Sequence, residues 1–164
     1  MHLIIAGVAP RQPTVLGLDT LSRSDSSPKV VDWQHMSVSF NHTIVAAKNK
    51  KESAGFLTEL FGLPDAKPFG HFLAVIVDND VSLDYAEVPT GQEIRPQHYA
   101  FLVSEDEFDS IYGKIRGRGI QHWADPRQSR PGEINHNDGG RGVYFQDPSG
   151  HYLEIITRPY GSGG

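Results

Sequence analysis

The amino-acid sequence predicts an α+β protein built from two similar modules, each with the element order βαβββ. A β-rich run followed by an amphipathic helical segment occurs twice, once from residue 42 and again from residue 98. Further strand candidates follow each helix and are joined by the turns Asp78-Asn79-Asp80 and Asp147-Pro148-Ser149-Gly150. Neither half has enough strands to close a core alone, so we expect the two sheets to pack together.

The first module, at about residues 38–90, begins with a predicted strand at 42–47. A helix is expected over 51–61, because its large apolar residues cluster on one side and Gly62 follows as a stop signal. After Pro64, the residues 71–77 and 81–88 have the β-rich composition of two paired strands.

The second module, at about residues 94–159, begins with a predicted strand at 98–103. Ser104 with Glu107 forms a capping box, and the helix that follows places Phe108, Ile111, Tyr112 and Ile115 on one face. Gly117 to Gly119 ends the helix. A short strand at 120–123, a polar loop at 124–141 and strands at 142–146 and 151–157 complete the module.

Composition narrows the possible functions. The 164 residues include 20 acidic and 15 basic side chains, which give a net charge of −5 and argue against a nucleic-acid groove. There is no cysteine, so disulfides, thiolate metal sites and cysteine nucleophiles are excluded, and any metal must be bound by histidine and carboxylate. No apolar run is long enough to span a membrane, and we expect a cytoplasmic protein without membrane or nucleic-acid partners.

Residues 1–35 differ in composition from the rest of the chain. They are rich in Pro, Ser, Gly and charge, and are predicted to be a disordered N-terminal extension. Met36 begins a segment that resembles a fresh domain start, so the domain is placed at 36–160, followed by a flexible tail at 161–164. The extension is either a natural arm or the product of a start codon assigned too early, and we favour the second explanation.

Three residues occupy related positions in the repeat. His98 follows His42 by 56 residues, and Glu154 follows His98 by 56 residues. Strand alternation places His42 with Ile44 and Ala46, and leaves His98 on the face away from its helix. Glu154 lies between Leu153 and Ile155, where a carboxylate is costly to bury without a positive partner. Two imidazoles and a carboxylate form a facial triad suited to a divalent metal ion, although three unrelated polar residues at strand edges would also fit this spacing.

The run Tyr144-Phe145-Gln146-Asp147-Pro148-Ser149-Gly150-His151-Tyr152-Leu153-Glu154, together with the His-x-x-x-Ala strand openings, resembles the vicinal oxygen chelate superfamily over residues 38–159. This group contains glyoxalases, fosfomycin-resistance transferases, extradiol dioxygenases and bleomycin-resistance proteins. The resemblance implies a paired-sheet, cup-shaped barrel and a homodimer. It also implies one divalent metal per site, held by His42, His98 and Glu154, with Fe²⁺ or Mn²⁺ favoured over Zn²⁺ or Ni²⁺. The substrate would be a small molecule that binds through two vicinal oxygens.

Glyoxalase-like members of this superfamily usually add a fourth ligand, an acid in the last strand of the first module. Matching Asp78 to Asp147 aligns Tyr85 with Glu154, so that Asp84 and Glu87 would serve only after a register shift. A tyrosine there favours a three-ligand site, as in the dioxygenases and fosfomycin transferases. Tyr144 matches an active-site tyrosine of both groups, with a packed aromatic as the alternative.

The resemblance does not decide which reaction the protein catalyses. Fosfomycin transferases use a threonine where this chain has Ile44, and a lysine in the loop 125–140, which offers only arginines. Extradiol dioxygenases carry a histidine in this loop, and His136 resembles it with an offset of about one residue, which implies an acid–base group. The first hypothesis is therefore an extradiol-dioxygenase-like oxidoreductase. The alternatives are a metal-dependent thiol transferase of the fosfomycin-resistance type and a metal-free drug-binding protein of the bleomycin-resistance type.

Three further residues are candidates for substrate binding. Strand alternation places His71 on a face that would line the cavity, and His122 lies at a strand end where it would form part of the substrate wall. Arg141 would neutralise an anionic substrate. For each of the three, a plain packing or surface role is the alternative. His151, in the turn after Gly150, is expected to be solvated.

Overall fold

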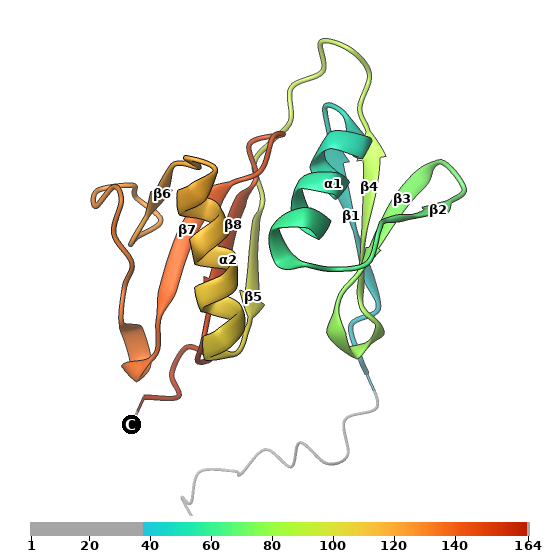
Figure 1. The fold of residues 1–164 in the computed structure, drawn as a ribbon. Coiled ribbons are helices and arrows are strands. Elements are labelled where there is room, and N and C mark those ends of the chain that lie inside the picture. The colour runs from blue at the N-terminus through green and yellow to red at the C-terminus, as the bar shows by residue number, and fades with distance from the viewer. Residues whose placement is uncertain (1–37, 164) are drawn as a thin grey trace, which may run out of the picture. The chain divides into compact units, whose positions relative to one another are not determined.

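A computed structural model describes residues 38–163 and confirms the two βαβββ modules (Figure 1). The predicted extension and Met36 lie outside the described residues. Among the described residues, no helix is long and apolar enough to cross a membrane. The first module contains β1 (His42–Ala47), α1 (Lys50–Phe61), β2 (Lys67–Phe69), β3 (Phe72–Ile76) and β4 (Ser82–Glu87); the second contains β5 (His98–Leu102), α2 (Glu105–Gly117), β6 (His122–Trp123), β7 (Gly142–Gln146) and β8 (Tyr152–Ile156).

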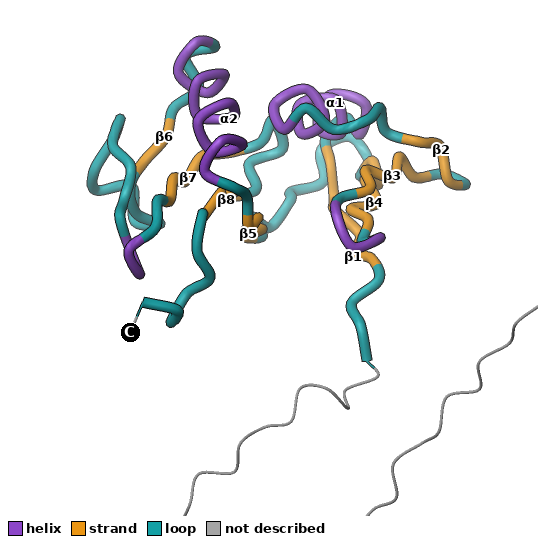
Figure 2. Tube along the Cα trace, turned by 60° about the horizontal axis from the view of Figure 1, so that its bottom comes forward, coloured by secondary structure: helices purple, strands orange, loops and turns teal. Residues whose placement is uncertain are grey.

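Each module forms a four-stranded mixed sheet with the same topology. The strand orders are β1-β4-β3-β2 and β5-β8-β7-β6, and the first two strands of each sheet run parallel. Figure 2 shows that α1 and α2 both lie on one side of their strands. Strand β2, which contains Pro68, is not among the strands that the sequence predicts. Proline is tolerated there because β2 is an edge strand.

The helix boundaries follow from capping. The side chain of Asn49 accepts hydrogen bonds from the backbone of Lys51 and Glu52, and Gly62 ends α1 with a φ of +70° that glycine adopts easily. At the start of α2, the predicted capping box is present. Ser104 accepts from the Glu107 backbone while the Glu107 carboxylate accepts from the Ser104 backbone.

One apolar core serves both modules and lies on the helix-covered side of the sheets. Contacts between modules are direct, since the rings of Phe61 and Phe101 are 4.9 Å apart and those of Phe56 and Phe145 are 6.5 Å apart. The opposite face of each sheet, which we call the open face, is not covered by an α-helix within residues 38–163 and carries several exposed apolar side chains. Among them are Ile44, Phe69, Ile76 and Leu102. In the part of the chain that the structure describes, the modules are therefore joined through their helix-covered side, and the open faces point away from this junction.

The β7–β8 turn also joins the modules. His151 is 1% exposed, so the expectation of a solvated side chain is wrong. Its Nδ1 accepts from the Gln97 backbone at 3.0 Å, and its Nε2–H donates to the Ala46 carbonyl in β1 at 2.7 Å. Ser149 in the same turn bonds the Lys48 backbone and the Ser53 hydroxyl of the first module. The turn is buried because it is the joint between the two halves.

The structure corrects the alignment of the last strands. Both hairpins are closed by equivalent bonds, from Val77 N–H to the Val81 carbonyl and from Asp147 N–H to the His151 carbonyl. Asp147 therefore corresponds to Val77 and not to Asp78. The pairing agrees, because Ile44 lies opposite Asp84 in the first sheet and Ala100 lies opposite Glu154 in the second. Glu154 is thus equivalent to Asp84, and the alignment with Tyr85 was wrong by one residue.

Candidate functional site

His98 and Glu154 meet on the open face of the second sheet. Strand alternation in β8 directs Leu153 and Ile155 into the core and Glu154 to the opposite face, where the sequence pattern predicts it. The Nε2 of His98 lies 3.1 Å from Oε2 of Glu154, and because a carboxylate only accepts, this nitrogen carries the proton. Glu154 is 1% exposed while the His98 side chain is 45% exposed. The pair therefore presents a buried carboxylate beneath an accessible imidazole.

Two tyrosines extend this pair into a hydrogen-bonded chain. The Tyr160 hydroxyl donates to Oε1 of Glu154, and the Tyr144 hydroxyl lies 2.7 Å from the Tyr160 hydroxyl, to which it donates. The ring of Tyr144 is 5.8 Å from that of His98. Burial, together with the neighbouring carboxylate of Glu154, raises the pKa of both Tyr144 and Tyr160. Both hydroxyls are thus neutral donors at physiological pH.

His42 lies on the open face of the first sheet, in a hollow of about 470 Å³ that also contains Asp84. The two residues are arranged in β1 and β4 as His98 and Glu154 are arranged in β5 and β8. Asp84 is 5% exposed, and its Oδ1 accepts from the Ser82 hydroxyl at 2.8 Å. The fold thus places one histidine and one carboxylate at matching strand positions in each module.

The donor atoms suit a divalent metal, since imidazole nitrogen and carboxylate oxygen are ordinary ligands of Fe²⁺, Mn²⁺ and Zn²⁺. Within residues 38–163, however, no three histidine or acidic side chains come close enough together to hold an ion. His42 therefore does not join His98 and Glu154 within one chain. The structure brings two of the three predicted metal ligands together and leaves the third on the other sheet.

The remaining histidine candidates lie apart from this pair. His71 is exposed in the turn between β2 and β3, where its ring stacks on Phe72 at 3.9 Å. His122 lies on the helix-covered side of β6, with its ring 5.4 Å from that of Tyr112 and its Nδ1 bonded to the Ile120 carbonyl. His136 is exposed in the loop before β7.

Arg141 holds β7 against α2. Its guanidinium contacts Glu105 at 2.6 Å and Asp109 at 2.5 Å, and lies 4.4 Å from the centre of the Phe108 ring. These carboxylates raise the pKa of Arg141, which stays charged. The N–H groups of its guanidinium are engaged in these contacts. Arg141 is therefore placed to hold β7 against α2 and not, as predicted, to contact a substrate.

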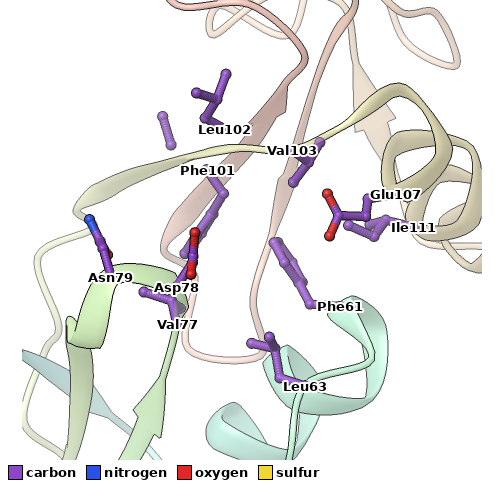
Figure 3. A pocket seen from close by; sticks show the side chains of 11 residues that line it. Phe61, Leu63, Val77, Asp78, Asn79, Phe101, Leu102, Val103, Glu107 and Ile111 are labelled. Atoms are coloured by element: carbon purple, nitrogen blue, oxygen red, sulfur yellow. The ribbon is translucent and has the colours of Figure 1, made fainter. Parts of the chain in front are cut away.

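A second hollow, of about 400 Å³, lies between the end of α1, the β3–β4 turn and β5 (Figure 3). Its walls are mainly the apolar side chains of Phe61, Leu63, Phe101 and Val103. The Glu107 carboxylate at its edge is already used by the capping box of α2. This hollow lacks histidine and offers no metal-ligand set, so the open faces remain the candidate site.

Of the polar residues on these open faces, the sequence-based alignment set Asp84 aside and did not find Tyr160. Asp84 lies between Leu83 and Tyr85, the same apolar flanking that identified Glu154, so the signal was present in the sequence. Tyr160 follows Glu154 by six residues, beyond the end of β8, and no periodicity places its hydroxyl beside the carboxylate. Only the path of the chain after β8 brings it there.

Comparison with known proteins gives consistent results. The sequence model of the Glyoxalase/Bleomycin resistance protein/Dioxygenase superfamily matches residues 39–155. A solved structure named Oxidase ChaP-H2 is 61% identical, with a TM-score of 0.75, and the match covers 79% of this chain and 100% of that chain. Glutathione transferase FosA of Serratia marcescens is 31% identical over 124 residues, which are 71% of this chain and 79% of that protein.

A more distant structure resembles the chain in fold alone. The fosfomycin resistance protein FosX of Listeria monocytogenes, solved in complex with Mn(II) and sulfate, is 18% identical, with a TM-score of 0.57. The match covers 78% of this chain and 95% of that chain.

Proposed function

Because the chain belongs to the glyoxalase/bleomycin resistance/dioxygenase superfamily, whose members bind divalent metals, we propose that it is a metal-dependent oxidoreductase. The substrate is a small molecule with two adjacent oxygens, and Fe²⁺ or Mn²⁺ is the favoured ion. The supporting observation is the His98–Glu154 pair, 3.1 Å apart on the open face of a chain 61% identical to an oxidase. As a finer hypothesis, the reaction is of the extradiol-dioxygenase type.

The site requires a second copy of the chain. His98 and Glu154 leave metal positions free, and His42 lies on the open face of the other sheet. Both open faces carry exposed apolar side chains, among them Ile44, Ile76 and Leu102, whose burial would favour association. In a homodimer, the first open face of one subunit covers the second open face of its partner. His42 of the partner subunit then completes the site, and the paired sheets form the cup that the family resemblance implies.

The corrected alignment adds a fourth donor. Asp84 shares a hollow with His42, so a partner that brings His42 to the site brings Asp84 as well. Two imidazoles and two carboxylates leave fewer free positions than a triad, but still enough for a substrate with two adjacent oxygens. Because Asp84 and not Tyr85 is equivalent to Glu154, the residue at this position no longer favours a three-ligand site. The 61% identity to an oxidase is what supports an oxidoreductase.

The metal supplies Lewis acidity and a redox centre when bound. The chain itself fixes Glu154 between His98 and Tyr160 and removes it from water, which strengthens its attraction for a cation. Tyr144, whose raised pKa keeps it protonated, donates its hydroxyl proton to Tyr160 and keeps a lone pair beside the site that can accept a hydrogen bond from a substrate hydroxyl. His136 is retained as a second acid–base candidate, because a partner subunit or a substrate can approach its exposed side chain.

Metal analysis and oxygen uptake test this proposal. Protein purified without added chelator should contain a divalent ion, and Glu154→Gln should lose it, whereas Glu93→Gln, on an exposed side chain, should retain it. Oxygen consumption with catechols after anaerobic loading with Fe²⁺ then tests the reaction class. Protein that binds neither Fe²⁺ nor Mn²⁺ would refute the enzyme proposal and favour a metal-free binding protein of the bleomycin-resistance type.

A metal-dependent thiol transferase is the second candidate, and the 31% identity to FosA supports it. Ile44 argues against fosfomycin itself, because an apolar side chain occupies the position of the expected threonine. The loop before β7 carries arginines where these transferases use a lysine. The guanidinium of one of them, Arg130, lies 3.9 Å from the Asp125 carboxylate, so its positive charge is partly offset. Thiol consumption with an epoxide, in the absence of oxygen uptake with catechols, would favour this alternative.

A further inference from the structure

The chain after β8 contributes a side chain to the candidate site. Tyr160 lies six residues beyond Glu154 in sequence, and its hydroxyl donates to Oε1 of that carboxylate. The same oxygen of Tyr160 accepts from the Tyr144 hydroxyl at 2.7 Å. Tyr160 itself is 52% exposed, so its ring stands at the surface while its hydroxyl reaches the buried carboxylate.

Close packing sets the path of this segment, Thr157–Gly163. The Thr157 hydroxyl accepts from the Arg141 backbone at 2.9 Å. A Cβ atom added at Gly140 would lie 2.9 Å from the Thr157 hydroxyl oxygen, and one added at Gly163 would lie 2.6 Å from the Cα of Asp138. Glycine is therefore required at both contacts, where the segment lies against the loop that precedes β7. The position of Tyr160 is built into the fold by these contacts.

The two oxygens of Glu154 consequently have different partners. Oε1 accepts from Tyr160, and Oε2 faces the Nε2 of His98. Because Glu154 is 1% exposed, water does not satisfy either oxygen, and these two contacts set the rotation of the carboxylate. A carboxylate held in this way directs a single oxygen toward His98.

We propose that Tyr160 is a positioning residue of the metal site. Its hydroxyl holds Oε1 of Glu154 and leaves Oε2 on the side of His98, where it would face the ion once the imidazole proton lies on Nδ1 instead of Nε2. The proposal rests on the proposed function, since it assumes that Glu154 is a ligand. Hydrogen-bond partners of metal ligands are worth about 10- to 100-fold in metal affinity, which sets the expected size of the effect.

The first test compares Tyr160→Phe with Tyr112→Phe. Both changes remove one hydroxyl, but the Tyr112 hydroxyl lies 3.4 Å from His122 on the helix-covered side. Calorimetric titration with Mn²⁺ should show about 10-fold or greater loss of affinity for Tyr160→Phe only. The visible spectrum of Co²⁺-loaded protein should also change in this variant, because the freed carboxylate rotates. Unchanged affinity and spectrum, or tighter binding, would overturn the proposal.

A second test displaces the segment without touching the hydroxyl. Gly163→Ala places a methyl group against the Asp138 backbone, so it should reproduce the loss seen with Tyr160→Phe. Gly113→Ala on α2 meets no atom within 4 Å and serves as the matched control. Wild-type metal affinity in Gly163→Ala would show that the packing of the segment does not position Tyr160.

A measurement on metal-free protein separates this inference from the proposed function. In protein labelled with 3-fluorotyrosine, the ¹⁹F resonance of Tyr160, assigned by its absence in Tyr160→Phe, should shift in Glu154→Gln. No shift would remove the hydrogen bond on which the inference depends. If the shift occurs but the wild-type protein binds neither Mn²⁺ nor Co²⁺, the proposed function and the role of Tyr160 at a metal both fail. If Glu154→Gln alone loses the metal, only the role of Tyr160 fails.

Discussion

Subunit complementation gives a direct test of where the metal site lies. His42→Ala removes a donor from one open face, and Glu154→Gln removes a donor from the other. Each homodimer of a single variant is expected to lack a donor at both of its sites. In a mixed dimer, the intact His42 of one chain meets the intact His98 and Glu154 of the other. The second site of the mixed dimer lacks both donors.

The expected magnitude follows from this geometry. With one intact and one doubly impaired site, the mixed dimer should bind about one ion, against about two for the wild-type dimer and almost none for either parent. Co-expression of the two variants with different affinity tags, followed by purification on both, isolates the mixed species. Equilibrium dialysis against Mn²⁺ then measures the stoichiometry, at a concentration that leaves the parents largely empty.

Two outcomes would refute the reasoning. A mixed dimer that binds no more metal than the parents, although its mass is that of a dimer, would place the donors of each site within a single chain. A wild-type protein that binds one ion per chain while remaining monomeric in sedimentation would do the same. Oxygen uptake on the Fe²⁺-loaded mixed dimer provides an independent reading of the same count.

Three further predictions concern single residues. His151→Ala should lower the free energy of unfolding in urea by about 2–4 kcal/mol, because it leaves a cavity at a buried side chain and two part-buried backbone groups, at Gln97 and Ala46, without their partner; a loss below about 1 kcal/mol would contradict this. Burial raises the pKa of Asp147 above its unfolded value of 3.8, so the folded state binds the proton more tightly and stability should fall as pH rises from that value through the folded pKa. Asp147→Asn should flatten this part of the pH–stability curve, and an unchanged slope would show that another group causes it. Asp84→Asn should weaken Mn²⁺ binding, because Asp84 is proposed as a fourth donor. If this variant binds Mn²⁺ as tightly as the wild-type protein does, the site has three ligands and not four.

Much of the fold could be predicted because it is determined by local patterns in the sequence. The capping box at Ser104, the apolar face of α2 and the strand faces of Leu153 and Ile155 are set by neighbours only a few residues away. The same alternation placed His98 and Glu154 on one face, and their 3.1 Å separation agrees with it. Short-range periodicity was sufficient for these residues because one face of each element is buried.

The features that the sequence did not predict depend on contacts between residues far apart in the chain. The alignment of Asp84 failed because the two hairpin turns have similar compositions but differ by one residue in where they begin. The closing hydrogen bonds show that Asp147 is equivalent to Val77 and not to Asp78. His151 is buried by a contact with β1, 105 residues away. Tyr160 reaches Glu154 only through the packing of the last segment against Asp138. Neither the contact of His151 nor that of Tyr160 follows from a local pattern.

The buried turn around Ser149 and His151 has a consequence for how the chain folds. It ties β1 to β5 and β8, and the core beneath is shared between the halves, so neither module has a free energy of unfolding of its own. The protein should denature in one cooperative transition, and amides of β1 and β8 should exchange with solvent at the same opening free energy. The two halves are thus repeated in topology but inseparable in folding, and cutting the chain between them would yield two fragments without an independent native state.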